Sequence, residues 1–336
     1  VGWRTLSIRL FTSMQLRSRA MVIGSAATVR SVAERMRQAL PQYNIVGAIA
    51  DDVPMLPLLG DDSARRAFIR KIAEMRVTEL VLATEKPVSP ALEWVIADCY
   101  ERGIAIRPLA ALYEEVLGWV PVHITPQPLF PIPLWRSGNM PSVYQSFKRW
   151  LDLVAALGGL ALLVPILPWV ALAIVLNSRG PIFYTQERVG KGGRTFRLLK
   201  FRSMVADAER AGSAQWATRG DQRITSVGRF LRRTRIDELP QLLNVVMGDM
   251  SLVGPRPERP SFVELLAVEI PFYRARLRVL PGLTGWAQIN HGYTSSVEDT
   301  LMKLQYDLFY IKHQSLALDI LILLRTVRVI VTMGGT

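Results

Sequence analysis

Short apolar runs alternate with amphipathic stretches through the first third of the chain. The apolar runs are typical of buried strands and lie at residues 20–24, 43–52, 77–84 and 104–109. The stretches between them have the spacing of amphipathic helices and lie at residues 25–40, 63–76 and 89–103. Because strands and helices alternate, the pattern predicts an α/β domain over residues 19–115, a Rossmann-like parallel sheet with right-handed crossovers.

The first strand and the turn after it carry part of a dinucleotide-binding fingerprint. That fingerprint needs three glycines, so that the backbone can approach a pyrophosphate. Gly24 is present, whereas Ala26 and Val29 stand where the other two would be. Asp51 and Asp52 end the second strand, where an acid that binds ribose could lie. The pattern therefore favours a structural or regulatory domain over one that binds a cofactor.

Two irregular segments flank this domain. Residues 116–146 are rich in proline and aromatic side chains and show no steady period, which predicts an extended linker. Residues 1–18 contain basic side chains and lack the pattern of a secretory signal, so we interpret them as a membrane-proximal lead-in.

A long apolar run follows the linker, and no residue from Leu153 to Leu176 is charged. A straight helix of this length would measure roughly 36 Å at ~1.5 Å per residue, enough to cross a hydrocarbon core of ~30 Å. However, Pro165 and Pro168 lie near its middle, where each costs a helix ~3 kcal/mol. Basic residues flank both ends of the run: Lys148, Arg149, Arg179, Arg188, Lys191, Arg194, Arg197, Lys200 and Arg202. The pattern favours a re-entrant membrane helix over residues 147–177, with a spanning helix or a buried core helix as alternatives.

Composition adds a constraint on partners. The formal net charge of +13 requires an anionic partner, and nucleic acid, a membrane surface and phosphorylated substrates all satisfy it. The single cysteine, Cys99, excludes an internal disulfide and is compatible with a reducing cytoplasm. The three histidines lack zinc-like spacing.

The region after the apolar run is dense in glycine and basic side chains. Its glycines permit close backbone approach and its cations are donors to phosphate, so the segment suits a phosphorylated ligand. A solvated basic face lying on anionic lipid is an equal alternative. The residues concerned are Gly190, Gly192 and Gly193 with Arg188, Lys191, Arg194, Lys200 and Arg202.

An adjacent pair of acids, Asp237 and Glu238, follows a cluster of arginines. A carboxylate among arginines stays ionised and can act as a nucleophile toward phosphorus or as a ligand for Mg²⁺. Asp237 could also cap a helix that begins at Glu238, since aspartate is a favoured N-cap. From the residues alone, capping and catalysis both remain open.

The second half of the chain resembles a known family, the bacterial polyprenyl-phosphate sugar-1-phosphate transferases that prime exopolysaccharide, capsule and O-antigen repeat units. The resemblance covers residues 147–336 and rests on the ordered motifs KRWLD, GPIFYTQERVGKGGRTF, KFRSM, DQRITSVGRFLRRTRIDELPQLLNV, GDMSLVGPRPE, PGLTGWAQIN, YDLFYI and SLALDILILLRTV. It implies a mainly α-helical, monotopic membrane catalytic domain. The region before it resembles the domain that precedes the transferase in larger members, which usually carry four transmembrane helices upstream. This sequence has none of these, so we expect a truncated or shortened form.

The resemblance implies a two-step exchange. Asp237, at the position of the family's nucleophile, would attack the β-phosphorus of a UDP-sugar and release UMP. Undecaprenyl phosphate would then take the phosphosugar from the carboxylate. Glu238 completes the family's acidic dyad, and Mg²⁺, with Asp237 as a ligand, would neutralise the diphosphate. The substrate-binding positions carried over from the family are Arg232, Lys200, Arg202, Pro255, Arg256 and Pro257.

The resemblance also implies partners and a location. The partners are a UDP-sugar, undecaprenyl phosphate and the lipid of the bacterial inner membrane, with the catalytic domain on the cytoplasmic face and no nucleic acid. UDP-glucose or UDP-galactose is the expected donor, although His291, where the family often has glycine, weakens any transfer of sugar preference from relatives. Arg325 and Arg328, one turn apart on an apolar stretch, suit a helix in the membrane interface or a packed helix with an exposed edge.

Three further questions stay open at the level of sequence. A homodimer formed through the N-terminal domain is an alternative to a monomer. A basic scaffold without catalysis, tethered to a membrane or bound to nucleic acid, would also explain the charge. A nicotinamide-dependent oxidoreductase built on residues 20–110 is the remaining alternative, and the missing glycines count against it.

Overall fold

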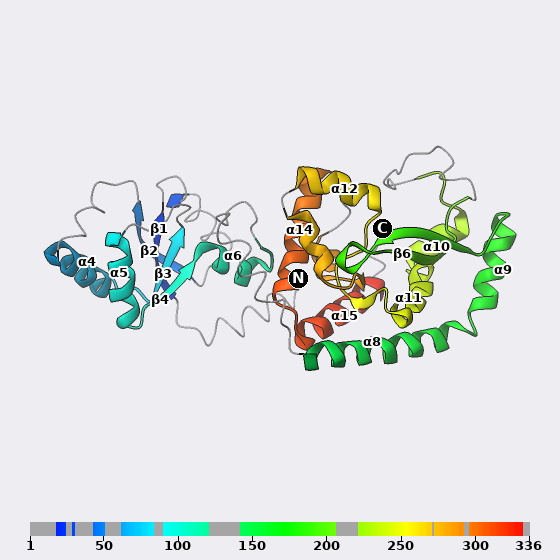
Figure 1. The fold of residues 1–336 in the computed structure, drawn as a ribbon, viewed down its shortest axis with the longest axis horizontal. Coiled ribbons are helices and arrows are strands. Elements are labelled where there is room, and N and C mark those ends of the chain that lie inside the picture. Colours follow the sequence, from blue (N-terminus) through cyan, green and yellow to red (C-terminus); the bar gives the residue numbers. More distant parts are fainter. Residues whose placement is uncertain are drawn as a thin grey trace. The chain divides into compact units, whose positions relative to one another are not determined.

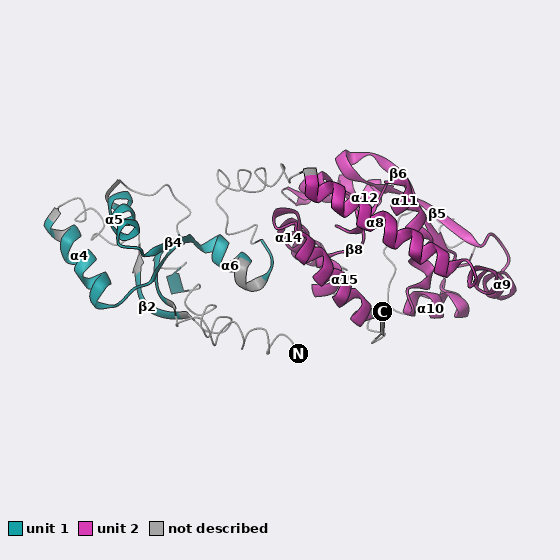
Figure 2. Ribbon diagram, turned by 90° about the horizontal axis from the view of Figure 1, so that it is seen from below, with its two compact units in different colours: residues 1–130 teal, residues 131–336 magenta. Residues whose placement is uncertain are grey.

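The computed structural model describes residues 18–24, 29–30, 43–50, 62–83, 90–120, 142–205, 221–270, 272–291 and 296–331. The chain divides into two compact units, residues 1–130 and 131–336 (Figure 2). Most of the predicted lead-in, of the helix predicted at residues 25–40 and of the predicted linker lies outside the described residues.

The described part of unit 1 is a parallel sheet with helices on both faces (Figure 1). The strand order is β2-β1-β3-β4, with β1 at Ser18–Gly24, β2 at Tyr43–Ala50, β3 at Glu79–Ala83 and β4 at Ala105–Pro108. The helices are α4 at Asp62–Glu74, α5 at Pro90–Glu101 and α6 at Leu109–Leu117. This arrangement confirms the parallel α/β sheet predicted from the alternation of runs.

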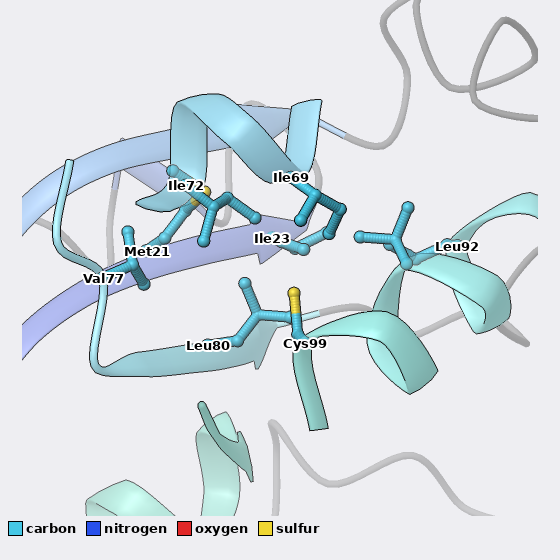
Figure 3. Close-up of a cluster of buried hydrophobic side chains, with 9 residues drawn as sticks. Met21, Ile23, Ile69, Ile72, Val77, Leu80, Leu92 and Cys99 are labelled. Atoms are coloured by element: carbon cyan, nitrogen blue, oxygen red, sulfur yellow. The ribbon is translucent and has the colours of Figure 1, made fainter. Parts of the chain in front are cut away.

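Successive side chains of β1 point to opposite sides of the sheet, and the side chains on both sides are buried. Met21 and Ile23 pack under α4 and α5 in a cluster that includes Cys99 (Figure 3). Ala20 and Val22 pack on the other face, against α6. Burial raises the pKa of the Cys99 thiol to about 11, so this side chain stays protonated and packs as a small apolar group.

Gly24 has a packing role at the end of β1. A Cβ at this position would lie 2.6 Å from the carbonyl oxygen of Ala83 on β3, so only glycine permits the two strands to approach this closely. Val29, where the fingerprint would have a glycine, is buried in the core of the sheet. These contacts explain the partial fingerprint by strand packing.

Unit 2 is mainly helical, with two small pairs of strands. A hairpin forms from the antiparallel strands β5 (Phe183–Val189) and β6 (Thr195–Phe201), and β7 (Ser251–Val253) pairs in parallel with β8 (Gly282–Thr284). The helices are α8 (Ser142–Leu163), α9 (Leu167–Asn177), α10 (Ser226–Arg233), α11 (Leu242–Met247), α12 (Pro260–Glu269), α13 (Trp286–Asn290), α14 (Val297–Lys312) and α15 (Leu316–Val331). Short 3₁₀ turns are η1 (Lys191–Gly193), η2 (Ile236–Gln241) and η3 (Tyr273–Arg278).

The long apolar run forms two helices, α8 and α9, whose axes differ by 62° (Figure 1). Pro165 lies in the break and Pro168 in the first turn of α9, where a missing backbone N–H costs little. In the described parts of the chain, no single helix is both long and apolar enough to cross a membrane, whereas this bent pair meets the criterion jointly. The helix also begins at Ser142, before the boundary predicted at residue 147.

Three glycines of two sequence motifs bring the β7–β8 region together. A Cβ on Gly282 would lie 2.1 Å from the backbone nitrogen of Gly254, and one on Gly285 would lie 2.2 Å from its carbonyl oxygen. Such distances exclude any side chain, so the GPRP and PGLTGW motifs are joined backbone to backbone. This contact fixes the loop that follows β7.

Candidate active site

The adjacent acids Asp237 and Glu238 lie in the first turn of η2, which continues directly into α11. Arg235, the N-cap, has a φ of 60°, a left-handed conformation that costs a non-glycine residue about 1–2 kcal/mol. The turn brings both acids into the interior, where Asp237 is 6% exposed and Glu238 is 8% exposed. The interpretation of Asp237 as an N-cap is therefore wrong, because Arg235 holds that position and Asp237 lies inside the helical turn.

Glu238 is surrounded by cations from separate segments. Its Oε1 accepts hydrogen bonds from Lys200 Nζ at 3.1 Å and from Arg256 Nη2 at 2.7 Å, and Arg235 Nη1 lies 3.8 Å away. Burial opposes ionisation most strongly, but the combined attraction of these three cations outweighs it. The pKa of Glu238 is consequently held well below its usual value, and the side chain is a carboxylate at neutral pH.

Asp237 is the less satisfied member of the pair. Its Oδ1 is buried and accepts no hydrogen bond from any residue that the structure describes. Burial and the neighbouring charge of Glu238 raise the pKa of Asp237 to about 6, against the opposing attraction of Lys200, Arg232 and Arg235. An unpaired buried acceptor costs about 1–3 kcal/mol, so this oxygen is suited to a group that the chain itself does not supply.

Asp237 fits Mg²⁺ as a single carboxylate ligand, with waters and substrate phosphates as the other ligands. Among the described residues, no three His, Cys, Asp or Glu side chains gather to hold a metal ion. Mg²⁺ does not need such a cage, because it commonly binds through one or two carboxylates together with waters and substrate phosphates. Asp237 Oδ1, which has no hydrogen-bond partner in the described part of the chain, can serve as that carboxylate ligand.

Arg232 is positioned by the packing of α10 against the end of β6. Its Nε donates to the hydroxyl of Ser203 at 2.8 Å. Thr225 caps α10 by accepting from the N–H of Gly228, and a Cβ at Gly228 would lie 2.0 Å from the carbonyl oxygen of Ser203. Glycine at this position therefore lets α10 approach closely enough to present Arg232 beside the dyad, where its charge lowers the pKa of Asp237.

Arg202 is placed differently from the phosphate-facing role expected of it. Its side chain is buried, and its Nη2 donates to the carbonyl oxygens of Ile174 and Ser178 and to the Ser178 hydroxyl. These are acceptors at the C-terminal end of α9, where a cation also complements the helix dipole. The structure thus brings Lys200 to the dyad and sends Arg202 to the bent helix pair.

The loop of Pro255, Arg256 and Pro257 is held by its backbone, which leaves the Arg256 side chain directed at Glu238. Arg276 Nη2 donates to the carbonyl oxygen of Arg256 at 2.9 Å. Arg188 Nη1 donates to the carbonyl oxygen of Pro257 at 3.0 Å. The two proline rings limit the loop further by fixing φ on either side of Arg256.

A buried charge network behind this loop was not predicted from the sequence. Arg276 Nη2 lies 2.8 Å from Asp307 Oδ2, and Glu258 pairs with Lys303 at 2.5 Å and with Arg188 and Arg276 at 3.7 Å. Arg188, interpreted as a donor to phosphate, is therefore engaged inside the protein. An acid within the apolar YDLFYI motif was the available signal, because an isolated buried carboxylate requires a partner.

Residues 190–194 form the turn around η1 in the β5–β6 hairpin. His291 follows α13, and Arg325 lies on α15. Arg325 stacks over the ring of Trp286, with the guanidinium carbon 5.2 Å from the ring centroid. His291 stacks on Tyr306, and its Nε2 lies 3.8 Å from Asp299 Oδ1. None of these three-dimensional contacts involves the dyad.

Comparison with known proteins finds one matching family and several similar transferases. The bacterial sugar transferase family matches residues 143–333. The chain is 42% identical over 261 residues to the UDP-N-acetylgalactosamine-undecaprenyl-phosphate N-acetylgalactosaminephosphotransferase of Aeromonas hydrophila, covering 76% of this chain and 60% of that protein. It is 48% identical over 187 residues to the UDP-glucose:undecaprenyl-phosphate glucose-1-phosphate transferase of Caulobacter vibrioides, covering 55% of this chain and 70% of that protein.

A third relative extends the similarity along nearly the whole chain. The UDP-glucose:undecaprenyl-phosphate glucose-1-phosphate transferase of Xanthomonas campestris pv. campestris is 33% identical over 332 residues, covering 93% of this chain and 66% of that protein. The chain spans less than two thirds of the length of the Aeromonas relative. The similarity therefore includes both units, although the family match lies in unit 2.

Proposed function

The chain belongs to the bacterial sugar transferase family, and we propose that it transfers a hexose 1-phosphate from a UDP-sugar to undecaprenyl phosphate, priming exopolysaccharide, capsule or O-antigen synthesis. The observation that carries this proposal is the Asp237–Glu238 pair. Asp237 has a buried oxygen that accepts no hydrogen bond from the described residues, and Glu238 is held by Lys200, Arg256 and Arg235. This is the arrangement that an oxygen nucleophile for phosphorus needs.

In the first step, an oxygen of Asp237 attacks the β-phosphorus of the donor. A bond forms between the carboxylate and phosphorus, the bond from that phosphorus to the bridging oxygen breaks, and UMP leaves with the electron pair. In the second step, an oxygen of undecaprenyl phosphate attacks the same phosphorus and displaces Asp237. The carboxylate is regenerated, so the exchange requires no net oxidant or proton donor.

The cations around the dyad support both steps. Lys200, Arg256 and Arg235 outnumber the two carboxylates, so the site attracts an anionic diphosphate. Glu238 keeps these cations in place while Asp237 reacts. Arg232, beside the dyad, supplies a further cation for phosphate. Mg²⁺ bound with the donor would stabilise the charge that develops on the departing UMP, with Asp237 as its protein ligand.

For the donor sugar we propose glucose or galactose. The Caulobacter and Xanthomonas relatives carry UDP-glucose in their names, and a relative from Erwinia amylovora is a UDP-galactose-lipid carrier transferase. The Aeromonas relative is named for UDP-N-acetylgalactosamine, so that donor is the main competitor in any test.

We also propose that the bent pair α8–α9 enters the cytoplasmic leaflet of the inner membrane and returns to the same side. The pair exposes many large apolar side chains, which would be costly in water, whereas a bilayer accepts them. Exposed apolar side chains of the pair are Val143, Phe147, Trp150, Val154, Leu157, Leu162, Trp169, Leu172, Val175 and Leu176. Ile320, Leu324 and Val327 on α15 are also exposed and would lie in the interface.

The N-terminal end of α8 is bound to other helices of unit 2. These contacts set the point at which the helix pair α8–α9 leaves the folded domain. Lys148 Nζ donates to Asp319 Oδ2 on α15 at 2.9 Å. Arg149 donates to the carbonyl oxygens of Val245 and Val246 at the end of α11. The acids of η2 lie directly before α11, so α11 connects the dyad to the N-terminal end of α8. This suits a reaction between a soluble donor and a phosphate at headgroup level.

Release of UMP tests the proposal. Purified protein in detergent is incubated with undecaprenyl phosphate, Mg²⁺ and each of UDP-glucose, UDP-galactose and UDP-N-acetylgalactosamine. We expect turnover of one hexose donor that is lost with EDTA and falls by at least about a thousandfold in Asp237→Asn, because the nucleophile is removed.

Asp98→Asn is the matched control for this test. Asp98 forms an ion pair with Arg65 in unit 1, at 3.2 Å, so its substitution should leave turnover unchanged. Undiminished UMP release by a folded Asp237→Asn variant would rule out the covalent route. Absence of UMP from every donor in folded, membrane-bound protein would rule out the proposed activity.

A further inference from the structure

A fully buried asparagine, Asn244, joins the dyad-bearing helix to the strand that carries Lys200. Asn244 lies on α11 and is 0% exposed. Its Nδ2 donates to the carbonyl oxygen of Arg197 at 2.8 Å, and its Oδ1 accepts from the N–H of Leu199 at 3.1 Å. Both backbone groups belong to β6, so one side chain closes two hydrogen bonds with the strand.

The two hydrogen bonds use the edge of β6 that does not face β5. β6 pairs with β5 along one edge, and the backbone groups of alternate residues in such a pair point to the other edge. Arg197 and Leu199 are alternate residues, and the Asn244 amide meets their outward carbonyl and N–H as a peptide group of a third strand would. Asn244 therefore fixes the position of β6 along its own length, and its orientation about its own axis, relative to α11.

The backbone of Asn244 is fixed as well. Its carbonyl oxygen accepts from the N–H groups of Gly248, Asp249 and Met250 at the end of α11. The side chain consequently extends from a rigid point, and displacement of β6 would break hydrogen bonds in the interior. A buried amide without partners costs about 1–3 kcal/mol, which keeps the strand in this register.

Lys200 directly follows Leu199, and its Nζ reaches Glu238 at 3.1 Å. Glu238 and Asn244 stand on one continuous segment, because η2 runs directly into α11. The two side chains therefore attach this segment to β6 at two points, one through an ion pair and one through the backbone. A lysine side chain has many rotamers, so its ammonium group stays in place only if its backbone is held.

We propose that Asn244 is a positioning residue for the transfer reaction, which holds β6 so that Lys200 is placed against the dyad. The inference rests on the proposed function, and it assigns to Asn244 a role through Lys200 rather than a contact with substrate. A purely structural asparagine would affect stability and activity without regard to which residue stands at position 200. This difference can be measured.

The test is a double-mutant cycle between Asn244→Ala and Lys200→Met, with kcat and KM for UMP release and thermal unfolding measured on each full-length protein. If Asn244 acts through Lys200, Asn244→Ala should lower kcat by about tenfold in the native background and by less than about twofold when Lys200 is already Met. Equal losses in both backgrounds would show that the role is structural and would overturn the proposal.

Two further variants make the result decisive. Asn244→Asp keeps the acceptor for Leu199 but sets a carboxylate oxygen against the Arg197 carbonyl, so we expect the same background-dependent loss with a smaller change in volume. Asn177→Ala is a second control, since the exposed Asn177 also makes two hydrogen bonds, but to Ser226 and Val227 of α10 rather than to β6. Its effect should be equal in both backgrounds.

Failure of this inference can be told from failure of the proposed function. Native protein that turns over a donor, together with additive losses in the cycle, contradicts the role of Asn244 alone. Native protein that releases no UMP from any donor contradicts the proposed function. If neither Asn244 variant yields folded protein, the residue is required for folding and the positioning proposal is overturned.

Discussion

At the scale of single residues, the site depends on how buried charges are paired. Two adjacent carboxylates cannot both be ionised in the interior without cations, and here the cations are shared unequally. Glu238 receives Lys200 and Arg256, whereas Asp237 Oδ1 has no hydrogen-bond partner among the described residues. This asymmetry is the basis on which we propose a holding role for Glu238 and a reacting role for Asp237.

Glu258, next to the loop that carries Arg256, is also a buried carboxylate that neighbouring cations keep ionised. Burial opposes its ionisation most strongly, but Lys303, Arg276 and Arg188 outweigh this effect and hold the pKa of Glu258 at about 2, compared with an ordinary value of 4.5. A carboxyl with a depressed pKa in the folded protein stabilises the fold fully above its unfolded pKa. That contribution is lost as the pH falls from 4.5 toward 2.

We therefore predict that Glu258→Gln unfolds at lower urea concentration than the native protein at pH 7, and that the difference narrows between pH 4.5 and pH 2. Urea unfolding followed by circular dichroism across this range measures it. Glu264→Gln, at an exposed position on α12, is the control and should change stability by less than about 0.5 kcal/mol. A difference between native protein and Glu258→Gln that is constant with pH would contradict the assignment.

At the scale of elements, close backbone packing aligns helices with the site. α10 approaches the end of β6 only because Gly228 has no side chain, and the same helix carries Arg232. Similar contacts among Gly254, Gly282 and Gly285 place the loop after β7. The glycines in these motifs thus act through the position of whole elements.

This packing gives a prediction for Gly228→Ala. The new Cβ would lie 2.0 Å from the Ser203 carbonyl oxygen, a backbone atom that cannot rotate away. We expect a loss of about 1–3 kcal/mol in unfolding free energy and a lower kcat, because α10 and Arg232 must move. Thermal unfolding and UMP release measure both effects.

Gly158 on α8 provides the matched control. A Cβ there meets no atom within 4 Å, and the helix would gain up to about 1 kcal/mol from the change to alanine. If both alanine variants behaved alike, steric contact with Ser203 would not be the reason for glycine at position 228.

At the scale of the whole molecule, the candidate site lies within one of the two compact units. Asp237, Glu238 and the cations around them all belong to unit 2, and each unit has its own buried cluster. The sheet of unit 1 packs both faces with apolar side chains, as a separate domain does.

A chain consisting of residues 131–336 should consequently retain UMP release within about threefold of the full chain in detergent. The measurement compares kcat for the two proteins at equal donor and acceptor concentrations, with Asp237→Asn in the short chain as the blank. Loss of activity in a short chain that unfolds cooperatively would show that unit 1 supports catalysis.

The sequence by itself determined the outline of this protein. Alternating apolar and amphipathic runs predicted the parallel sheet, because burial on both faces requires that pattern. The ordered motifs between residues 147 and 336 identified the family, and the prolines in the apolar run predicted its break. These features are local, so neighbouring residues are sufficient to specify them.

Only the tertiary structure decided which charges meet. Lys200 and Arg256 reach Glu238 from 38 and 18 residues away, and Arg276 pairs with Asp307 across 31 residues. Arg202, so close to Lys200 in the chain, is directed to the end of α9 instead. Basic residues in a row look equivalent in a sequence, because the strength of a charge pair depends on distance and burial, and both are set by packing between distant segments.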